Sequence, residues 1–166
     1  MASTRKIGDD AEKYVASLLE NEGYIVEIHP RTFRRIGKAY ISKDNDYHNV
    51  FDIKAEGPMD MIYVQVKYKE DRKHNSDAMK KIDALYPYAF PYQRVMYARV
   101  WKVWSNEGRR HKEYRMEIYE RVFSHLKGKA EWINTAGTVK EAVSIRKQYH
   151  IPIISSSSSA SASSMS

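Results

Sequence analysis

The chain has no cysteine, so it forms no disulfide, uses no thiolate nucleophile and holds no cysteine-ligated zinc. Its six histidines show no paired metal-ligand spacing, and no glycine-rich phosphate loop is present, which argues against an NTPase. No run approaches the roughly 20 apolar residues of a membrane span. The N-terminus is polar and charged from Ser3 onward. We therefore expect a cytoplasmic protein with no secretory leader and no membrane partner.

Composition predicts a folded domain with an affinity for polyanions. The chain has 166 residues, 42% of them apolar, which is enough for one domain with a proper core. We expect that domain over residues 1–154. Residues 155–166 are serine, alanine and one methionine and predict a disordered tail. The formal net charge of +7 favours a polyanionic partner, of which nucleic acid is the commonest.

Hydrophobic periodicity predicts helices and strands in an alternating order, which indicates an α/β fold. The predicted helices cover residues 4–22, 77–86, 120–126 and 138–149, with Gly128 ending the third. The predicted strands cover residues 24–28, 51–55, 63–69, 94–104 and 111–119. Both faces of the strand over 94–104 are apolar, which is typical of an internal strand. Residues 31–49 form either a mobile basic loop or a small irregular hairpin.

The most informative segments are the two strands over residues 51–55 and 63–69. The Gly57-Pro58 turn signal between them predicts a hairpin, with Glu56 and Asp60 as solvated turn residues. A turn centred near residues 58 and 59 places Asp52 opposite Gln65, with Lys67 two residues further along the same face. A carboxylate, an amide and a lysine amine then converge on one apolar scaffold. That combination suits metal-dependent cleavage of a phosphodiester.

These segments carry a resemblance to a known superfamily. The matching motifs are Gly8-x-x-x-Glu12, Gly23-Tyr24, Phe51-Asp52-Ile53-x-Ala55 and Val64-Gln65-Val66-Lys67. In this order they resemble the PD-(D/E)XK nucleases and, more narrowly, the archaeal-type Holliday junction resolvases. The resemblance covers about residues 5–69. It implies a restriction-endonuclease-like core, in which helices flank a mixed β-sheet.

The resemblance also implies roles for individual residues. Asp52 matches the central metal-binding carboxylate, Lys67 the motif lysine and Glu12 the helix glutamate that completes the site in the resolvases. Two positions depart from the pattern. Phe51 stands where proline usually precedes the acid, and Gln65 stands where a second acid is usual, as in restriction enzymes similar to the Mrr group.

Magnesium is the cofactor that this residue set predicts, with Mn²⁺ as a substitute. Magnesium prefers hard oxygen ligands, and four oxygens would come from the carboxylates of Asp52 and Glu12, the Gln65 amide and the Val66 carbonyl. Lys67 beside the ion would orient the attacking water or stabilise charge in the transition state. We expect catalysis to depend on Asp52, Gln65, Lys67 and Glu12.

Basic residues flank these motifs and predict contacts with DNA phosphates. They are Arg31, Arg34, Arg35 and Lys38 before the acid, and Lys69, Arg72 and Lys73 after the lysine. A second basic run follows the strand over 94–104 and consists of Arg109, Arg110, Lys112 and Arg115. The function that we expect is cleavage of branched DNA by a homodimer, because cutting two strands symmetrically needs two sites. The aromatic strands over residues 97–104 and 114–119 are the expected dimer contact.

Two alternatives stay open at this point. One is a restriction- or homing-type endonuclease that reads a base sequence. The other is a non-catalytic DNA-binding module on the same scaffold, in which Gln65 marks the loss of activity.

Overall fold

A computed structural model describes the protein at residues 3–28, 31–36, 39–44, 50–69, 76–85, 93–107, 111–124 and 126–149. Only the backbone is described at residues 31–36, 39–44, 76, 85 and 145–149. The tail expected over residues 155–166 therefore lies outside the described residues.

Six strands form one open, mixed sheet. In spatial order they are β1 (Ile25–Ile28), β4 (Ile53–Glu56), β5 (Met61–Tyr68), β6 (Gln93–Trp104), β7 (Lys112–Ser124) and β8 (Lys129–Ala136). Strands β5 and β6 are parallel, and every other neighbouring pair is antiparallel. The parallel pair needs a crossover, and helix α2 (Ser76–Leu85) lies between its two strands in the chain. The predicted α/β class and the internal position of β6 are confirmed.

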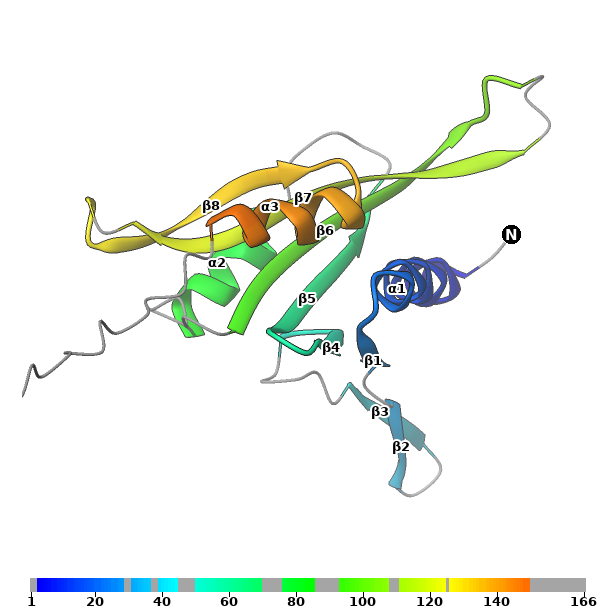
Figure 1. Ribbon diagram of the computed structural model, residues 1–166. Coiled ribbons are helices and arrows are strands. Elements are labelled where there is room, and N and C mark those ends of the chain that lie inside the picture. Colours follow the sequence, from blue (N-terminus) through cyan, green and yellow to red (C-terminus); the bar gives the residue numbers. More distant parts are fainter. Residues whose placement is uncertain are drawn as a thin grey trace, which may run out of the picture.

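Strands β2 (Arg31–Ile36) and β3 (Ala39–Asp44) form a separate two-stranded hairpin. Of the two alternatives for residues 31–49, the hairpin is therefore the one observed. Figure 1 shows this hairpin beyond β1 and β4, away from the rest of the sheet.

Helices cover both faces of the six-stranded sheet. Helices α1 (Thr4–Asn21) and α3 (Val139–Tyr149) lie on one face, and α2 lies on the other (Figure 1). Helix α1 begins at Ser3, whose hydroxyl accepts a hydrogen bond from the backbone N–H of Lys6 at 3.3 Å. Its buried side chains are Ala11, Val15, Ala16 and Leu19, which form the stripe that helical spacing requires. The larger core lies between this stripe, α3 and the sheet.

The prediction of a helix over residues 120–126 is wrong, because β7 continues through this segment to Ser124. Glu120 and Arg121 are both buried, and Arg121 donates a hydrogen bond to Asp83 of α2 at 2.8 Å. Gly128 has a φ of +62°, which suits a tight turn as well as the end of a helix. Here it makes the turn into β8, a strand that the sequence did not predict.

In the parts of the chain that the structure describes, no helix has the length and apolar character needed to cross a membrane.

Candidate active site

The hairpin of β4 and β5 has the register that the sequence predicts. Ile53 pairs with Val64 and Ala55 with Ile62, so Asp52 is directly opposite Gln65. Ile53, Ala55, Ile62 and Val64 are all buried in the core beneath α1. Because side chains alternate along a strand, this burial directs Gln65 and Lys67 to the opposite face. A register slip of one residue would expose the apolar set, so the hydrophobic pattern itself fixes the register.

Asp52 directly precedes the first residue of β4, and its carboxylate takes the place of a backbone acceptor for the Val66 N–H. The backbone N–H of Asp52 still donates to the Val64 carbonyl at 3.0 Å. Its Oδ2 accepts hydrogen bonds from the Gln65 side-chain Nε2 at 2.7 Å and the Val66 backbone N–H at 2.8 Å. Asp52 is 7% exposed and Gln65 is 4% exposed. The residue directly before β4 is thus a buried acid held against the middle of β5.

Lys67 follows Gln65 by two residues on the same strand face and is half-buried. Within the described residues, its ammonium group has neither an ion-pair partner nor a hydrogen-bond acceptor. A half-buried lysine usually pairs with a nearby acid, or its charged end extends into water. An unneutralised ammonium near the Asp52 carboxylate is what binding of an anionic phosphate would require.

Strand β6 adds two residues that sequence reasoning did not place in the site. Tyr97 pairs with Gln65 and Arg99 pairs with Lys67 across the parallel ladder, so both lie on the same face. The Tyr97 hydroxyl is buried and has no hydrogen-bond partner among the described residues. Burial raises the pKa of this phenol to about 12. Arg99 is 3% exposed and forms an ion pair with Glu117 of β7 at 3.1 Å.

The sequence predicts the alternation of side chains along β6, but it does not predict that β6 pairs with β5. Residues 97 and 99 share a face by strand periodicity, and that much was predictable. Their position beside Gln65 and Lys67 depends on the parallel pairing of β5 with β6, which local patterns do not reveal.

Glu12 comes from the other side of the sheet. It lies on α1, one turn before the buried Val15 and Ala16, and is half-buried. Helix α1 packs on the face of β4 and β5 opposite to the side chains of Gln65 and Lys67. Beyond Asp52, however, no described strand pairs with β5 on the β4 side. The described contacts do not join Glu12 to Asp52, so the role of Glu12 stays a prediction.

The donor set near Asp52 fits a hard divalent cation. Within the described residues, no three acidic or histidine side chains form a cluster that could hold a metal. Magnesium, however, is commonly held by one or two carboxylates and completes its shell with waters and substrate oxygens. Asp52 offers one carboxylate, and the Gln65 amide and Val66 carbonyl offer neutral oxygens. Both hydrogen bonds described above end on Oδ2 of Asp52.

A second buried charge cluster lies nearer the turn between β4 and β5. Arg94 is 1% exposed and donates to both carboxylate oxygens of Glu120, at 2.9 and 2.8 Å, and to the Ala142 carbonyl at 2.8 Å. It also lies 3.4 Å from Oδ2 of Asp60, whose Oδ1 accepts from the Tyr24 hydroxyl at 2.8 Å. Burial opposes the charge on Arg94, but the bonds to Glu120 still raise its pKa.

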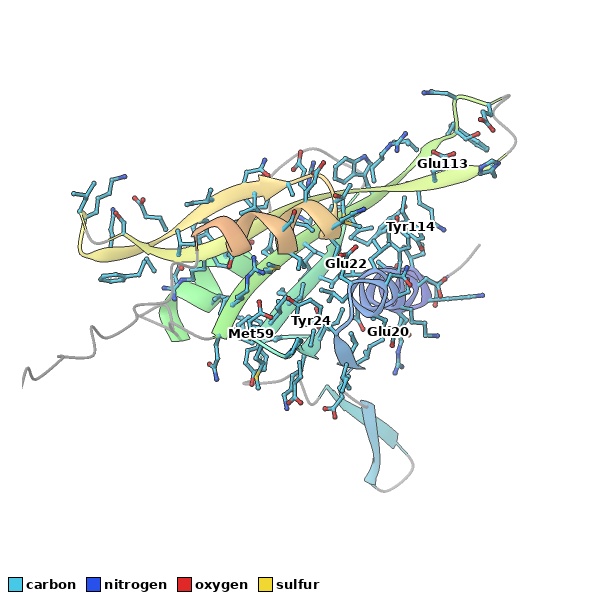
Figure 2. The ribbon with its side chains drawn as sticks, in the orientation of Figure 1. Glu20, Glu22, Tyr24, Met59, Glu113 and Tyr114 are labelled. Carbon is cyan, nitrogen blue, oxygen red and sulfur yellow. The ribbon has the colours of Figure 1, made fainter. Side chains whose placement is uncertain are left out.

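The expectation that Asp60 is a solvated turn residue is therefore wrong. Its side chain is only 14% exposed, because it lies between Arg94 and Tyr24. Burial and the bond to Asp60 raise the pKa of Tyr24 to about 12. Figure 2 shows Tyr24 beside Met59 at this end of the sheet. Glu56 is exposed, as expected, and pairs with Lys54 at 2.7 Å.

Most of the predicted phosphate-binding side chains are not described. The side chains of Arg31, Arg34 and Arg35 lie outside the described residues, although their backbone forms β2. Lys38, Arg72 and Lys73 lie entirely outside them, as do Arg109 and Arg110. Lys69 directly follows β5, is half-buried, and its backbone N–H donates to the Val100 carbonyl at 2.9 Å. Their contacts with DNA stay predictions.

Comparison of the chain with protein-family models gives no match, and comparison with curated proteins gives none either.

Proposed function

We propose that this protein is a metal-dependent endonuclease that hydrolyses DNA phosphodiester bonds, with branched, four-way-junction DNA as its substrate. The observation that carries the proposal is the pairing of buried Asp52 with Gln65, two residues from an ammonium group that has no ion-pair partner in the described part of the chain. The motif order in residues 5–69 supports the same conclusion, and so does the net charge of +7.

The chemistry needs an attacking water, a place for the extra negative charge and help for the leaving sugar oxygen. Asp52, Gln65 and Val66 would hold Mg²⁺, with Glu12 completing the set. A divalent ion bound there would lower the pKa of a water and neutralise phosphate charge. Lys67 would then hydrogen-bond the attacking water or a phosphoryl oxygen, with the substrate phosphate as its counter-ion.

The Tyr97 hydroxyl suits a role in the same site. It lies one strand away from Gln65 and needs a hydrogen-bond partner. A buried polar group without a partner costs roughly 1–3 kcal/mol, a cost that a bound water or phosphate oxygen would remove. We place Tyr97 as a positioning residue, because nothing described links it directly to the Asp52 carboxylate.

A homodimer completes this proposal. One protomer offers one such site, whereas symmetric cutting of a junction needs two. Tyr97 is 2% exposed within a single protomer, so it is not available as a dimer contact. A dimer formed through the aromatic strands would have to use their outer residues. The mass measured by sedimentation equilibrium would show whether the protein is a dimer.

The experiment is a cleavage assay with four DNA substrates of equal label: a four-way junction, a flap, a linear duplex and a single strand. We expect cleavage of the junction in Mg²⁺ or Mn²⁺, none in EDTA, and weaker cleavage of the linear duplex. Cleavage of the linear duplex at defined sequences would favour the restriction- or homing-type alternative. Metal-independent binding without any cleavage would favour a non-catalytic module and overturn the proposal.

A further inference from the structure

Strands β6 and β7 extend well beyond the rest of the sheet. The last β5 residue to pair with β6 is Tyr68, opposite Val100, and β8 pairs with β7 only from Ile118 onward. Among the described strands, residues 101–104 of β6 and 112–115 of β7 therefore pair only with each other. We call these eight residues the arm. Figure 1 shows the arm projecting away from the helices and the other strands.

Each of three cross-strand pairs in the arm combines a cation with an aromatic ring. The pairs are Trp101 with Arg115, Lys102 with Tyr114, and Trp104 with Lys112. The Nζ of Lys102 lies 4.7 Å from the centre of the Tyr114 ring, and that of Lys112 lies 5.3 Å from the Trp104 ring. Both distances are within the range of a cation–π contact. The ribbon thus holds its rings and ammonium groups side by side.

The base of the arm is anchored, whereas its outer part is open to solvent. Tyr114 stacks on Tyr14 of α1 with ring centres 4.3 Å apart. Figure 2 shows Tyr114 beside α1 and Glu113 further out along β7. Trp104 is 55% exposed. A two-stranded ribbon without a core is only marginally stable, so the exposed Trp104 indole adds little to the stability of the fold. Its exposure is better explained by a role in binding.

The surroundings of Trp104 favour nucleic acid over a protein partner. In the described part of the chain, the other exposed large apolar side chains are Ile25, Met59, Leu126 and Ile133, and none of them lies on the arm. Trp104 is therefore not part of a broad apolar patch, which a protein interface would need. Lys102 and Lys112 have no carboxylate partner among the described residues. Arg115 is 3.6 Å from Glu113, an exposed pair that neutralises it only weakly.

The arm is also continuous with the candidate active site. Arg99, the cross-strand neighbour of Lys67, places its guanidinium 4.4 Å from the centre of the Trp101 ring. From Arg99 to Trp104 the strand covers about 17 Å, at about 3.3 Å per residue. Because side chains alternate along β6, Arg99 and Trp101 share the face of Lys67, whereas Lys102 and Trp104 share the face of α1 with Tyr114. A DNA strand that leaves the active site would therefore meet Trp101 first and would reach Trp104 by crossing the edge of the ribbon.

We propose that the arm binds the unpaired strand at the branch point of a DNA substrate, an inference that rests on the proposed function. Trp104 stacks on an unpaired base, and Lys102 and Lys112 contact the flanking phosphates. Stacking of this kind tolerates any base, whereas a duplex offers no free base face to the ring. The arm thus distinguishes branched or single-stranded DNA from intact duplex.

The test is binding of the full chain in Ca²⁺, so that its outcome does not depend on cleavage. The probes are an oligo-dT strand, a four-way junction with unpaired bases at its centre, and a blunt duplex. We expect Trp104→Ala to weaken oligo-dT binding by about 10-fold and duplex binding by less than about twofold, with Trp104→Phe recovering most of the loss. The matched control is Ile133→Ala, an exposed apolar residue on β8, which leaves all three affinities unchanged.

A second experiment tests the two lysines of the arm by the salt dependence of binding. Lys102→Gln with Lys112→Gln removes two charges and reduces the slope of log affinity against log salt by about 1.4 for single strands. The control pair Lys127→Gln with Lys129→Gln removes the same charge at the turn between β7 and β8 and leaves the slope unchanged. Unchanged oligo-dT affinity in Trp104→Ala would overturn the proposal. An equal loss on duplex and single strand, or a change from dimer to monomer, would also overturn it.

Discussion

Two groups of charged side chains lie in the same sheet, and they differ in how the positive charge of each, on Arg94 and on Lys67, is compensated. Around Arg94, two carboxylates and a backbone carbonyl face one guanidinium, so charge meets charge at short distance. At Asp52, Oδ2 accepts hydrogen bonds from the Gln65 amide and the Val66 backbone N–H. The neighbouring Lys67 has no ion-pair partner in the described part of the chain.

This difference separates a structural cluster from a site that can bind a ligand. A buried ion pair whose partners are all protein atoms contributes to one conformation and has no charge left for a ligand. Lys67, whose ammonium has no carboxylate partner in the described part of the chain, retains its positive charge for an anion. Burial of charged side chains does not by itself distinguish the two groups. The partners of Arg94 and the lack of a described partner for Lys67 do.

The largest expected effect breaks the Arg94 cluster. Arg94→Leu removes the guanidinium bonded to Glu120 and the Ala142 carbonyl, so we expect a loss of about 3–5 kcal/mol in the free energy of unfolding, measured by urea titration. Cleavage per folded molecule should stay unchanged, because Arg94 does not touch the Asp52 group. A stable variant with lost activity would reverse the two assignments.

Next in size is removal of the uncompensated ammonium. Lys67→Ala should lower the rate of Mg²⁺-dependent cleavage by about 10²–10³-fold, the usual cost of one preorganised donor. The unfolding free energy should barely change, because the amine has no described partner to lose. The matched control is Lys54→Ala on the adjacent strand, whose lysine already pairs with Glu56. Equal activity of the two variants would contradict the account.

The smallest effect concerns two tyrosines, one in each cluster, that have the same raised pKa. Because their folded pKa of about 12 exceeds the ordinary value of 10, the neutral phenol is favoured in the folded state. This stability is fully present below pH 10 and is lost as pH rises through about 12. The loss per tyrosine is at most about 1.4 kcal/mol per pH unit.

The two tyrosines should differ at neutral pH. Tyr24→Phe removes the bond to Asp60 and should cost about 1 kcal/mol, whereas Tyr97→Phe removes a hydroxyl without a described partner and should cost nothing. Both variants should reduce the alkaline loss of stability seen in urea titrations at a series of pH values. An equal cost for both at neutral pH would show that Tyr97 has a structural partner too.

The hairpin of the candidate site was predictable because its determinants are local. The alternation of residues 51–55 and 63–69 and the turn between them fix the position of Asp52 opposite Gln65 without any knowledge of the rest of the fold. Helix α1 was predictable for the same reason, since its stripe and its Ser3 cap lie within one segment.

The remainder depends on residues far apart in the chain. Arg94 finds Glu120 and Ala142, which are 26 and 48 positions away, so no local pattern announces the cluster. The sequence predicts a helix over residues 120–126, whereas β7 continues to Ser124. Glu120 and Arg121 lie buried in this strand because their partners, Arg94 and Asp83, come from distant parts of the chain.

The central claim is that Asp52 holds the metal for DNA cleavage, and Asp52→Asn tests it most directly. Asparagine keeps an oxygen that can accept the Val66 N–H bond, so the fold should survive while the negative charge is lost. We predict at least about 10³-fold slower cleavage of a four-way junction in Mg²⁺, with junction binding in Ca²⁺ unchanged. Cleavage by this variant at the wild-type rate would contradict the account.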